Sequence, residues 1–168
     1  FSQEVRLASR GNERLNWLGG VYYSHEKLDE KFYSDFTYNL GYATLTKYTQ
    51  KADSLGLFGQ GDFKLTDKVK LIAGLRYENE DRKLDDFSTG YASYPASPNL
   101  VGTSTFPEVD RSLSSSEWSG KLGLEYQIAP ANLLYASFSR GVKSGGFTTY
   151  NSVYPQQTDP VKPEILLA

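Results

Sequence analysis

Few side chains in this chain of 168 residues could carry out covalent or acid–base chemistry. His25 is the only histidine, with Glu26 beside it, and there is no cysteine. The lack of cysteine excludes disulfides, thiol chemistry and cysteine-based zinc sites. One histidine next to one acid could bind a metal ion or move a proton, but no Ser–His–Asp arrangement can be argued from it. The simpler interpretation is a polar residue at the end of a strand.

Two short motifs resemble binding sites only superficially. "RGVKSGGF" (residues 140–147) is rich in glycine, yet it lacks the spacing of a phosphate-binding loop and the helix that follows one. Its two glycines more simply permit a bend. Two pairs of acids offer the oxygen ligands that Ca²⁺ prefers, although solvated loop charge explains them better: Asp85 with Asp86, and Glu108 with Asp110. The sequence therefore predicts neither an enzyme nor a cofactor or metal site.

Aromatic side chains are the abundant group that could bind a ligand, since they make up 14% of the chain and include 13 tyrosines. Many lie in "DEKFYSDFTYNLGYATLTKY", and a second segment with Phe87 is similar. Rings in a vestibule could stack on a planar ligand such as an aromatic iron chelate, a sugar or a macrocycle. Equally, the rings could pack on one another. The candidate ligand-binding residues are Phe32, Tyr33, Phe36, Tyr38, Tyr42 and Tyr48.

The elements that would position these side chains are strands, because apolar and polar residues alternate with period two along most of the chain. No helix is predicted. The sequence indicates six strands and the start of a seventh near Glu164: residues 2–9, 15–26, 55–64, 69–81, 118–127 and 133–142.

The connections between these strands alternate strictly between short and long. Residues 9–14, 65–68 and 128–132 are short and rich in turn-forming residues, whereas residues 27–54, 82–117 and 143–162 are long. Compact domains rarely carry several loops longer than about 12–15 residues. Short turns at one end and long loops at the other are typical of an outer-membrane β-barrel, with periplasmic turns and extracellular loops.

Composition also argues against two other classes of protein, helical membrane proteins and nucleic-acid-binding proteins. No stretch approaches the roughly 18 apolar residues of a membrane-spanning helix, which excludes helical membrane proteins but not barrels. A net charge of −2 argues against a nucleic-acid partner, which needs a basic surface.

One face of the predicted strands forms an apolar band between two aromatic rows, as a lipid-facing surface requires. The rim with short turns carries Trp17, Phe63 and Tyr126, and the rim with long loops carries Tyr23, Tyr77 and Trp118. The apolar positions between the two rows include Leu55, Leu57, Leu71, Leu75, Leu122 and Leu124.

The opposite face is too charged to be a dry core, because each unpaired buried charge would cost several kcal/mol. We expect it to face a wet lumen through Arg6, Gln60, Asp62, Arg76, Glu78, Lys121 and Glu125. The turn at 65–68 predicts three cross-strand pairs: Leu57 with Leu75, Leu55 with Tyr77, and Phe58 with Gly74. From alternation alone, a soluble antiparallel sheet with its leucines inside stays open as an alternative.

Four segments in series resemble the barrel of TonB-dependent receptors: "FSQEVRLAS", "LNWLGGVYYSHE", "LGLFGQGDFKLTDKVKLIAGLRYENEDR" and "LLYASFSRGVKSGGF". The resemblance spans nearly the whole chain and implies a 22-stranded outer-membrane barrel around an N-terminal plug. It also implies uptake of a ferric siderophore or another scarce nutrient, driven by the TonB complex.

On this resemblance, residues 1–168 are a partial β-barrel domain whose inward face meets the plug. A TonB box, a plug and a terminal aromatic strand are not found in the sequence, so the expected partners are the remaining barrel strands, the plug and outer-membrane lipid. Two alternatives stay open: a smaller barrel or soluble sheet that binds ligands without a plug, and a structural outer-membrane protein whose loops serve adhesion.

Overall fold

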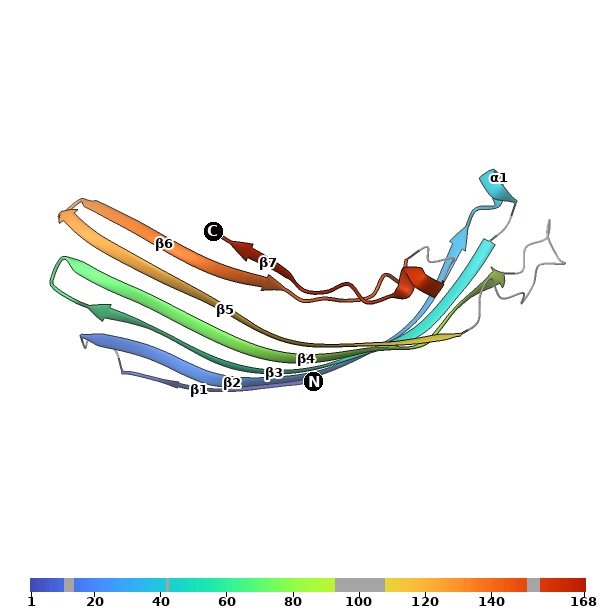
Figure 1. Cartoon of the computed structure of the whole chain (residues 1–168), viewed down its shortest axis with the longest axis horizontal. Helices are drawn as coiled ribbons and strands as arrows, with labels where there is room; N and C mark the ends of the chain where they lie inside the picture. Colours follow the sequence, from blue (N-terminus) through green and yellow to red (C-terminus); the bar gives the residue numbers. More distant parts are fainter. Residues whose placement is uncertain (11–13, 42, 93–107, 151–154) are drawn as a thin grey trace.

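The computed structural model describes residues 1–10, 14–41, 43–92, 108–150 and 155–168. They form one antiparallel sheet in which each strand pairs with the next along the chain (Figure 1). The strands are β1 (Ser2–Ala8), β2 (Leu15–Asp35), β3 (Ala43–Lys64), β4 (Val69–Ala92), β5 (Val109–Ala129), β6 (Asn132–Lys143) and β7 (Glu164–Leu167). The predicted seven-stranded antiparallel sheet is confirmed.

Helical structure is limited to two single turns among the described residues. One is α1 (Thr37–Leu40), between β2 and β3, and the other is the 3₁₀ turn η2 (Pro155–Thr158), between β6 and β7. Within the part of the chain that the structure describes, no helix has the length and apolar character needed to cross a membrane.

The strands run well beyond their predicted ends. Segments 27–54 and 82–117 are predicted loops, but β2 continues to Asp35, β3 starts at Ala43, β4 continues to Ala92 and β5 starts at Val109. The prediction was wrong because it required an apolar residue at every second position. Pairing needs only backbone N–H and C=O groups, so the ladder continues where both faces are polar.

The β3–β4 hairpin differs in register from the predicted one by two residues. The three predicted pairs are therefore wrong, and the observed pairs are Leu57–Tyr77, Leu55–Asn79 and Phe58–Arg76. The cause is the turn, where the backbone N–H groups of Leu65 and Thr66 both donate to the carbonyl oxygen of Val69. Because a shift of two residues preserves side-chain direction, every residue of the hairpin keeps its predicted face.

Phe58 does lie over a glycine, but on the other neighbouring strand. Its direct partner on β2 is Gly20. A Cβ atom built on Gly20 would stand 2.6 Å from Cζ of the Phe58 ring and 2.6 Å from the carbonyl oxygen of Val5. Glycine is required here because the ring and the β1 backbone occupy the space of a side chain.

Directly paired residues point to the same side of a sheet, so the register sorts the side chains into two faces. One face carries the row Val5–Val21–Leu57–Tyr77–Trp118, and the other carries the row Arg6–Gly20–Phe58–Arg76–Ser119. Hollows are lined from the second face, by side chains such as Gln60, Arg76 and Lys121. We call the second face concave and the first convex, as the bend of the strands in Figure 1 shows.

A small core lies on the concave face at the end remote from the short turns. Leu84, Phe87 and Val109 are buried there, and Tyr48 and Phe147 pack against them. Phe147 belongs to residues 144–163, which we call the β6–β7 segment. Its described residues, 144–150 and 155–163, lie over the concave side of the sheet. A Cβ atom built on Gly145 would stand 2.7 Å from Cδ2 of Leu113 on β5 and 2.3 Å from the carbonyl oxygen of Val161.

Candidate functional site

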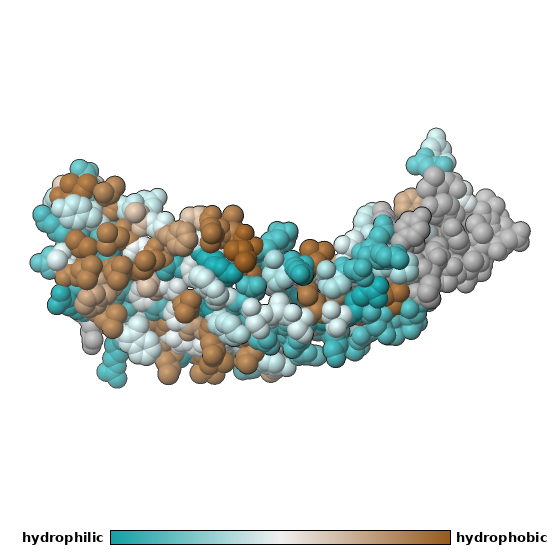
Figure 2. All heavy atoms as spheres, in the orientation of Figure 1, coloured by the Kyte–Doolittle hydropathy of each residue, from teal (hydrophilic) through white to brown (hydrophobic). Residues whose placement is uncertain are grey.

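The convex face carries all twelve residues that are predicted to face lipid: Trp17, Tyr23, Leu55, Leu57, Phe63, Leu71, Leu75, Tyr77, Trp118, Leu122, Leu124 and Tyr126. Ten of them are exposed large hydrophobic side chains, and only Phe63 and Leu71 are half-buried. Figure 2 shows hydrophobic residues gathered toward the end of the sheet with the short turns, and hydrophilic ones toward the other end. An exposed apolar surface of this extent needs a non-aqueous partner.

Aromatic side chains bound this apolar area on the convex face. Tyr77 and Trp118 are direct cross-strand partners in the row that also contains Val21. Tyr23 lies two residues beyond Val21 on β2. The guanidinium of Arg140 lies over the Trp118 ring, 4.3 Å from its centroid. At the other rim Arg14 lies over Phe63, 5.4 Å from the ring centroid. Amphipathic rings at both borders are the arrangement that suits membrane interfaces.

The concave face carries the seven residues that are predicted to face the lumen: Arg6, Gln60, Asp62, Arg76, Glu78, Lys121 and Glu125. Several are joined in ion pairs within the wall. Arg76 donates two hydrogen bonds to the carboxylate of Glu78, each 3.0 Å long, and Lys70 Nζ lies 2.7 Å from Glu125 Oε2. Such a paired and half-exposed set suits a wet interior.

Polar pairing continues along the concave face toward both ends of the strands. Asn16 Nδ2 donates to Asp62 at 3.1 Å, and among the described residues the buried Oδ1 atom of Asn16 has no hydrogen-bond partner. Arg82 Nε donates to Glu80 at 2.5 Å, and Arg6 pairs with Glu4.

The six candidate ligand-binding aromatics do not form one cluster. Phe32, Tyr33 and Tyr48 lie in strands β2 and β3 and not in a loop, while Phe36 and Tyr38 lie at the α1 turn. The predicted loop placement of Phe32, Tyr33 and Tyr48 is wrong, because the prediction ended each strand where the apolar alternation stops. Tyr42 lies outside the described residues.

These aromatic residues also differ in the face of the sheet on which they lie and in the side chains that they contact. Tyr33 is on the convex face and 49% exposed, and Tyr38 is 99% exposed. Phe32 and Tyr48 are half-buried on the concave face. The Phe32 ring lies 5.4 Å from the ring of Tyr150, and Tyr48 stacks on Phe87 at 5.9 Å.

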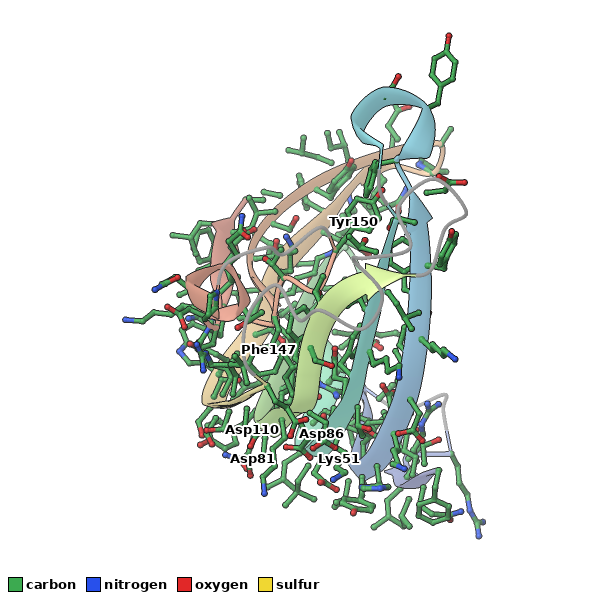
Figure 3. The ribbon with its side chains drawn as sticks, turned by 90° about the vertical axis from the view of Figure 1, so that its right-hand side faces the viewer. Lys51, Asp81, Asp86, Asp110, Phe147 and Tyr150 are labelled. Carbon is green, nitrogen blue, oxygen red and sulfur yellow. The ribbon has the colours of Figure 1, made fainter. Side chains whose placement is uncertain are left out.

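The β6–β7 segment supplies functional candidates that the sequence did not indicate. Phe147 and Tyr150 lie inside the curve of the sheet (Figure 3), where Thr149 Oγ1 donates to the Tyr48 hydroxyl at 3.3 Å. Arg111 Nε donates to Asp159 at 2.9 Å and holds the segment down. No local pattern links residue 111 to residue 159, so only the tertiary structure reveals this contact.

The three weak chemical motifs have structural explanations. His25 Nδ1 lies 2.7 Å from Asp53 Oδ1 on the exposed convex face. Arg140 through Lys143 belong to β6, and Gly145 and Gly146 permit the approach to Val161. Among the described residues, no group of three or more His, Asp or Glu side chains could hold a metal ion.

Beyond the aromatic residues the convex face is charged. Lys51 Nζ donates to Asp85 at 2.8 Å, and this partner raises the pKa of Lys51 above its usual range. Lys27 donates to Asp29 at 2.8 Å and Thr49 donates to it at 2.7 Å. These two hydrogen bonds lower the pKa of the Asp29 carboxyl.

Comparison with known proteins identifies the family. The sequence model described as TonB dependent receptor-like, beta-barrel, matches residues 2–166. Among solved structures, the ferric yersiniabactin uptake receptor FyuA from Yersinia pestis is similar, with a TM-score of 0.75 at 18% identity. The match covers 99% of this chain and 24% of that receptor, so the chain spans about a quarter of its length.

The structural similarity to FyuA shows the fold, and the family match adds the class of protein. Together they confirm the predicted resemblance and the antiparallel barrel-wall architecture. Receptors of this kind are transporters, which confirms the prediction of a non-enzyme. The chain belongs to the family of TonB-dependent receptors and matches its β-barrel domain.

Proposed function

We propose that the chain is a section of the barrel wall of an outer-membrane receptor that takes up ferric chelates or another scarce nutrient. The observation that carries the proposal is the division of one sheet into an exposed apolar convex face and an ion-paired concave face. In a barrel wall the first faces hydrocarbon and the second faces a wet interior. The similar receptor FyuA takes up ferric yersiniabactin, which supports ferric chelates as a substrate class.

In this proposal the twelve convex residues face lipid, and the seven concave residues face the lumen and a plug domain. The aromatic rows lie at the two interfaces of the outer membrane. The β2–β3 and β4–β5 ends point to the extracellular side, because they extend farther than the short turns. Energy for uptake comes from the TonB complex through the plug.

Phe32 and Tyr48 are the proposed ligand contacts among the six candidates. Both are half-buried on the concave face, next to Tyr150 and the hydroxyl of Thr149. An aromatic wall with phenol hydroxyls suits a planar chelate. Tyr33 belongs to the same strand as Phe32 but lies on the convex face, and therefore serves as an internal control.

The test is uptake by cells that carry the full-length receptor. Cells lacking it receive the wild type or the Phe32→Ala/Tyr48→Ala variant, and accumulation of a panel of ⁵⁵Fe-labelled chelates is measured with and without a functional TonB complex. We expect uptake of at least one chelate that needs TonB. The double variant should lose about tenfold in uptake at low ligand concentration, as expected when two stacking contacts are removed.

The Tyr33→Ala variant should transport like the wild type at equal surface expression. If the receptor transports no chelate in the panel and its loss does not impair growth under iron limitation, the substrate class is wrong. If uptake proceeds without TonB, the proposed energy coupling is wrong. Equal uptake by all variants would remove Phe32 and Tyr48 as ligand contacts.

A further inference from the structure

Two consecutive residues of the β6–β7 segment contact the two proposed ligand contacts. The Tyr150 ring lies 5.4 Å from the Phe32 ring, with the two planes tilted by 49°. One residue earlier, Thr149 Oγ1 donates a hydrogen bond of 3.3 Å to the Tyr48 hydroxyl. Tyr150 lies inside the curve of the sheet (Figure 3), so both aromatic side chains of the wall already have a partner on their inner side.

Phe32 and Tyr48 are close enough to act on one ligand. They lie on the concave face as diagonal neighbours on β2 and β3, a position in which side chains start about 7–8 Å apart. Phe87 stacks on the Tyr48 ring with the centroids 5.9 Å apart. A ligand therefore has to approach this pair from the lumen, which is the side where Thr149 and Tyr150 lie.

A guanidinium on β5 attaches the other end of the segment to the wall. Arg111 Nε donates to Asp159 Oδ1 at 2.9 Å, and Arg111 Nη2 donates to the carbonyl oxygen of Pro155 at 3.2 Å. Thr158 Oγ1 donates to the same carbonyl oxygen at 2.7 Å, and Thr158 is fully buried. These contacts hold the η2 turn against the concave face.

The two described parts of the segment are joined to each other by backbone pairing. Gly146 and Val161 exchange two hydrogen bonds, of 3.1 and 2.8 Å. Phe147, the residue after Gly146, packs against the small core of the wall. The attachment at Arg111 therefore also fixes the part of the segment that carries Tyr150.

This attachment consists partly of contacts that a ligand can replace. The side chains of Arg111 and Asp159 are 27% and 58% exposed, and an ion pair this exposed is weakened by water and salt. Tyr150 is 66% exposed, so its contact with Phe32 uses only part of its surface. A ring of a bound chelate could take the place of Tyr150 on Phe32.

We propose that Thr149 and Tyr150 form an autoinhibitory contact. They occupy the side of Phe32 and Tyr48 that faces the lumen, and a chelate must displace them to stack there. Arg111 is the positioning residue that keeps them in place. This inference rests on the proposed function, because it takes Phe32 and Tyr48 as ligand contacts. The apparent Kd is then the intrinsic Kd divided by the fraction of receptor in which the contact is released, so weakening the attachment should tighten binding.

The test is filter binding of two ⁵⁵Fe-labelled chelates, the tris-catecholate and the salicylate complex, to the full-length receptor in detergent micelles. We expect Arg111→Ala to lower the Kd about fivefold, near the upper end of what an exposed ion pair contributes. The association rate should rise and the dissociation rate should stay the same, because the variant changes the fraction of released receptor and not the bound state. Both chelates are anions, so the loss of a positive charge by itself would raise the Kd.

Tyr150→Ala should also lower the Kd, and it keeps the test decisive if Arg111→Ala does not fold. Three further variants separate position from charge. Arg111→Lys keeps a cation beside Asp159 and should stay close to the wild type. Arg111→Asp/Asp159→Arg restores the pair and should return the Kd of Arg111→Asp toward the wild-type value. Lys47→Ala removes an exposed positive charge from the convex face and should leave the Kd unchanged.

A higher Kd for Arg111→Ala and Tyr150→Ala would overturn the inference, because the segment would then be part of the ligand site. An unchanged Kd in both variants, with binding lost in Phe32→Ala/Tyr48→Ala, would contradict the autoinhibitory contact and keep the proposed ligand contacts. Unchanged binding in Phe32→Ala/Tyr48→Ala would contradict those contacts and the inference together. If neither chelate binds to the wild type or to any variant, the inference and the aromatic class of chelate are both wrong.

Discussion

At the scale of single residues, close approach decides which side chains the wall tolerates. Gly20 lies between the Val5 carbonyl oxygen on β1 and the Phe58 ring on β3. Its neighbour Gly19 points to the other face, where an added Cβ atom would first meet the Phe58 carbonyl oxygen at 3.5 Å. The two adjacent glycines therefore differ in what they can be replaced by.

Gly20→Ala should destabilise the barrel by about 1–3 kcal/mol, the usual cost of forcing an extra carbon into a filled site. Part of the strain falls on backbone, which cannot move aside as a ring can. The measurement is urea unfolding of the full-length receptor in micelles. Gly19→Ala is the matched control and should stay within about 0.5 kcal/mol of the wild type. Equal stability of the two variants would contradict the described register between β2 and β3.

At the scale of elements, the long strands serve two purposes. Their ends near the short turns carry the apolar convex surface, and their remote ends carry a small core that holds the β6–β7 segment. Phe87 is fully buried in that core and stacks on Tyr48. The sequence placed Phe87 in a loop, since its neighbours Asp85, Asp86 and Ser88 conceal the strand.

Phe87→Ala should release the β6–β7 segment, because the cavity left by a buried phenylalanine costs about 3–5 kcal/mol. Phe147, which packs against the cluster of Leu84, Phe87 and Val109, would then lose part of its support. The measurement is limited proteolysis of the full-length receptor on intact cells, with cleavage sites mapped between β6 and β7. Tyr38→Ala changes a side chain that is 99% exposed and should leave the cleavage rate unchanged. Unchanged cleavage in Phe87→Ala would show that the segment is held by other contacts, such as Arg111 with Asp159.

At the scale of the whole molecule, the sheet has one exposed apolar face and one face with ion pairs. Leu57 and Arg76 lie on adjacent strands, one on the convex face and one on the concave face. Leu57 is 54% exposed, and Arg76 is held by Glu78 and by the Tyr22 ring, 5.5 Å from its centroid. These two positions report separately on the two sides.

Leu57→Arg should cost the full-length barrel about 2–4 kcal/mol, as a charge near the middle of the membrane does. Arg76→Leu should cost clearly less, because the Glu78 carboxylate that it leaves without a partner stays partly exposed and can be solvated. Both free energies of unfolding are measured in lipid vesicles, together with the fraction of receptor that inserts. If Arg76→Leu is the more damaging of the two, the lipid and lumen faces are assigned the wrong way round.

The sequence by itself determined the fold class and the face of the sheet on which each predicted wall residue lies. It could do so because period two survives a shift of two residues, as the β3–β4 hairpin shows. Leu57 has a different partner from the predicted one, but it is still on the convex face with Leu75 and Tyr77.

Only the tertiary structure decided how far the strands extend, which residues pair across neighbouring strands, and where the candidate site lies. Backbone pairing continues through Lys27–Asp29 and Lys51–Asp53, where no apolar pattern marks a strand. Contacts such as Tyr48 with Thr149, or Arg111 with Asp159, join residues that are far apart in the chain. They depend on register and curvature, which local residue preferences do not encode.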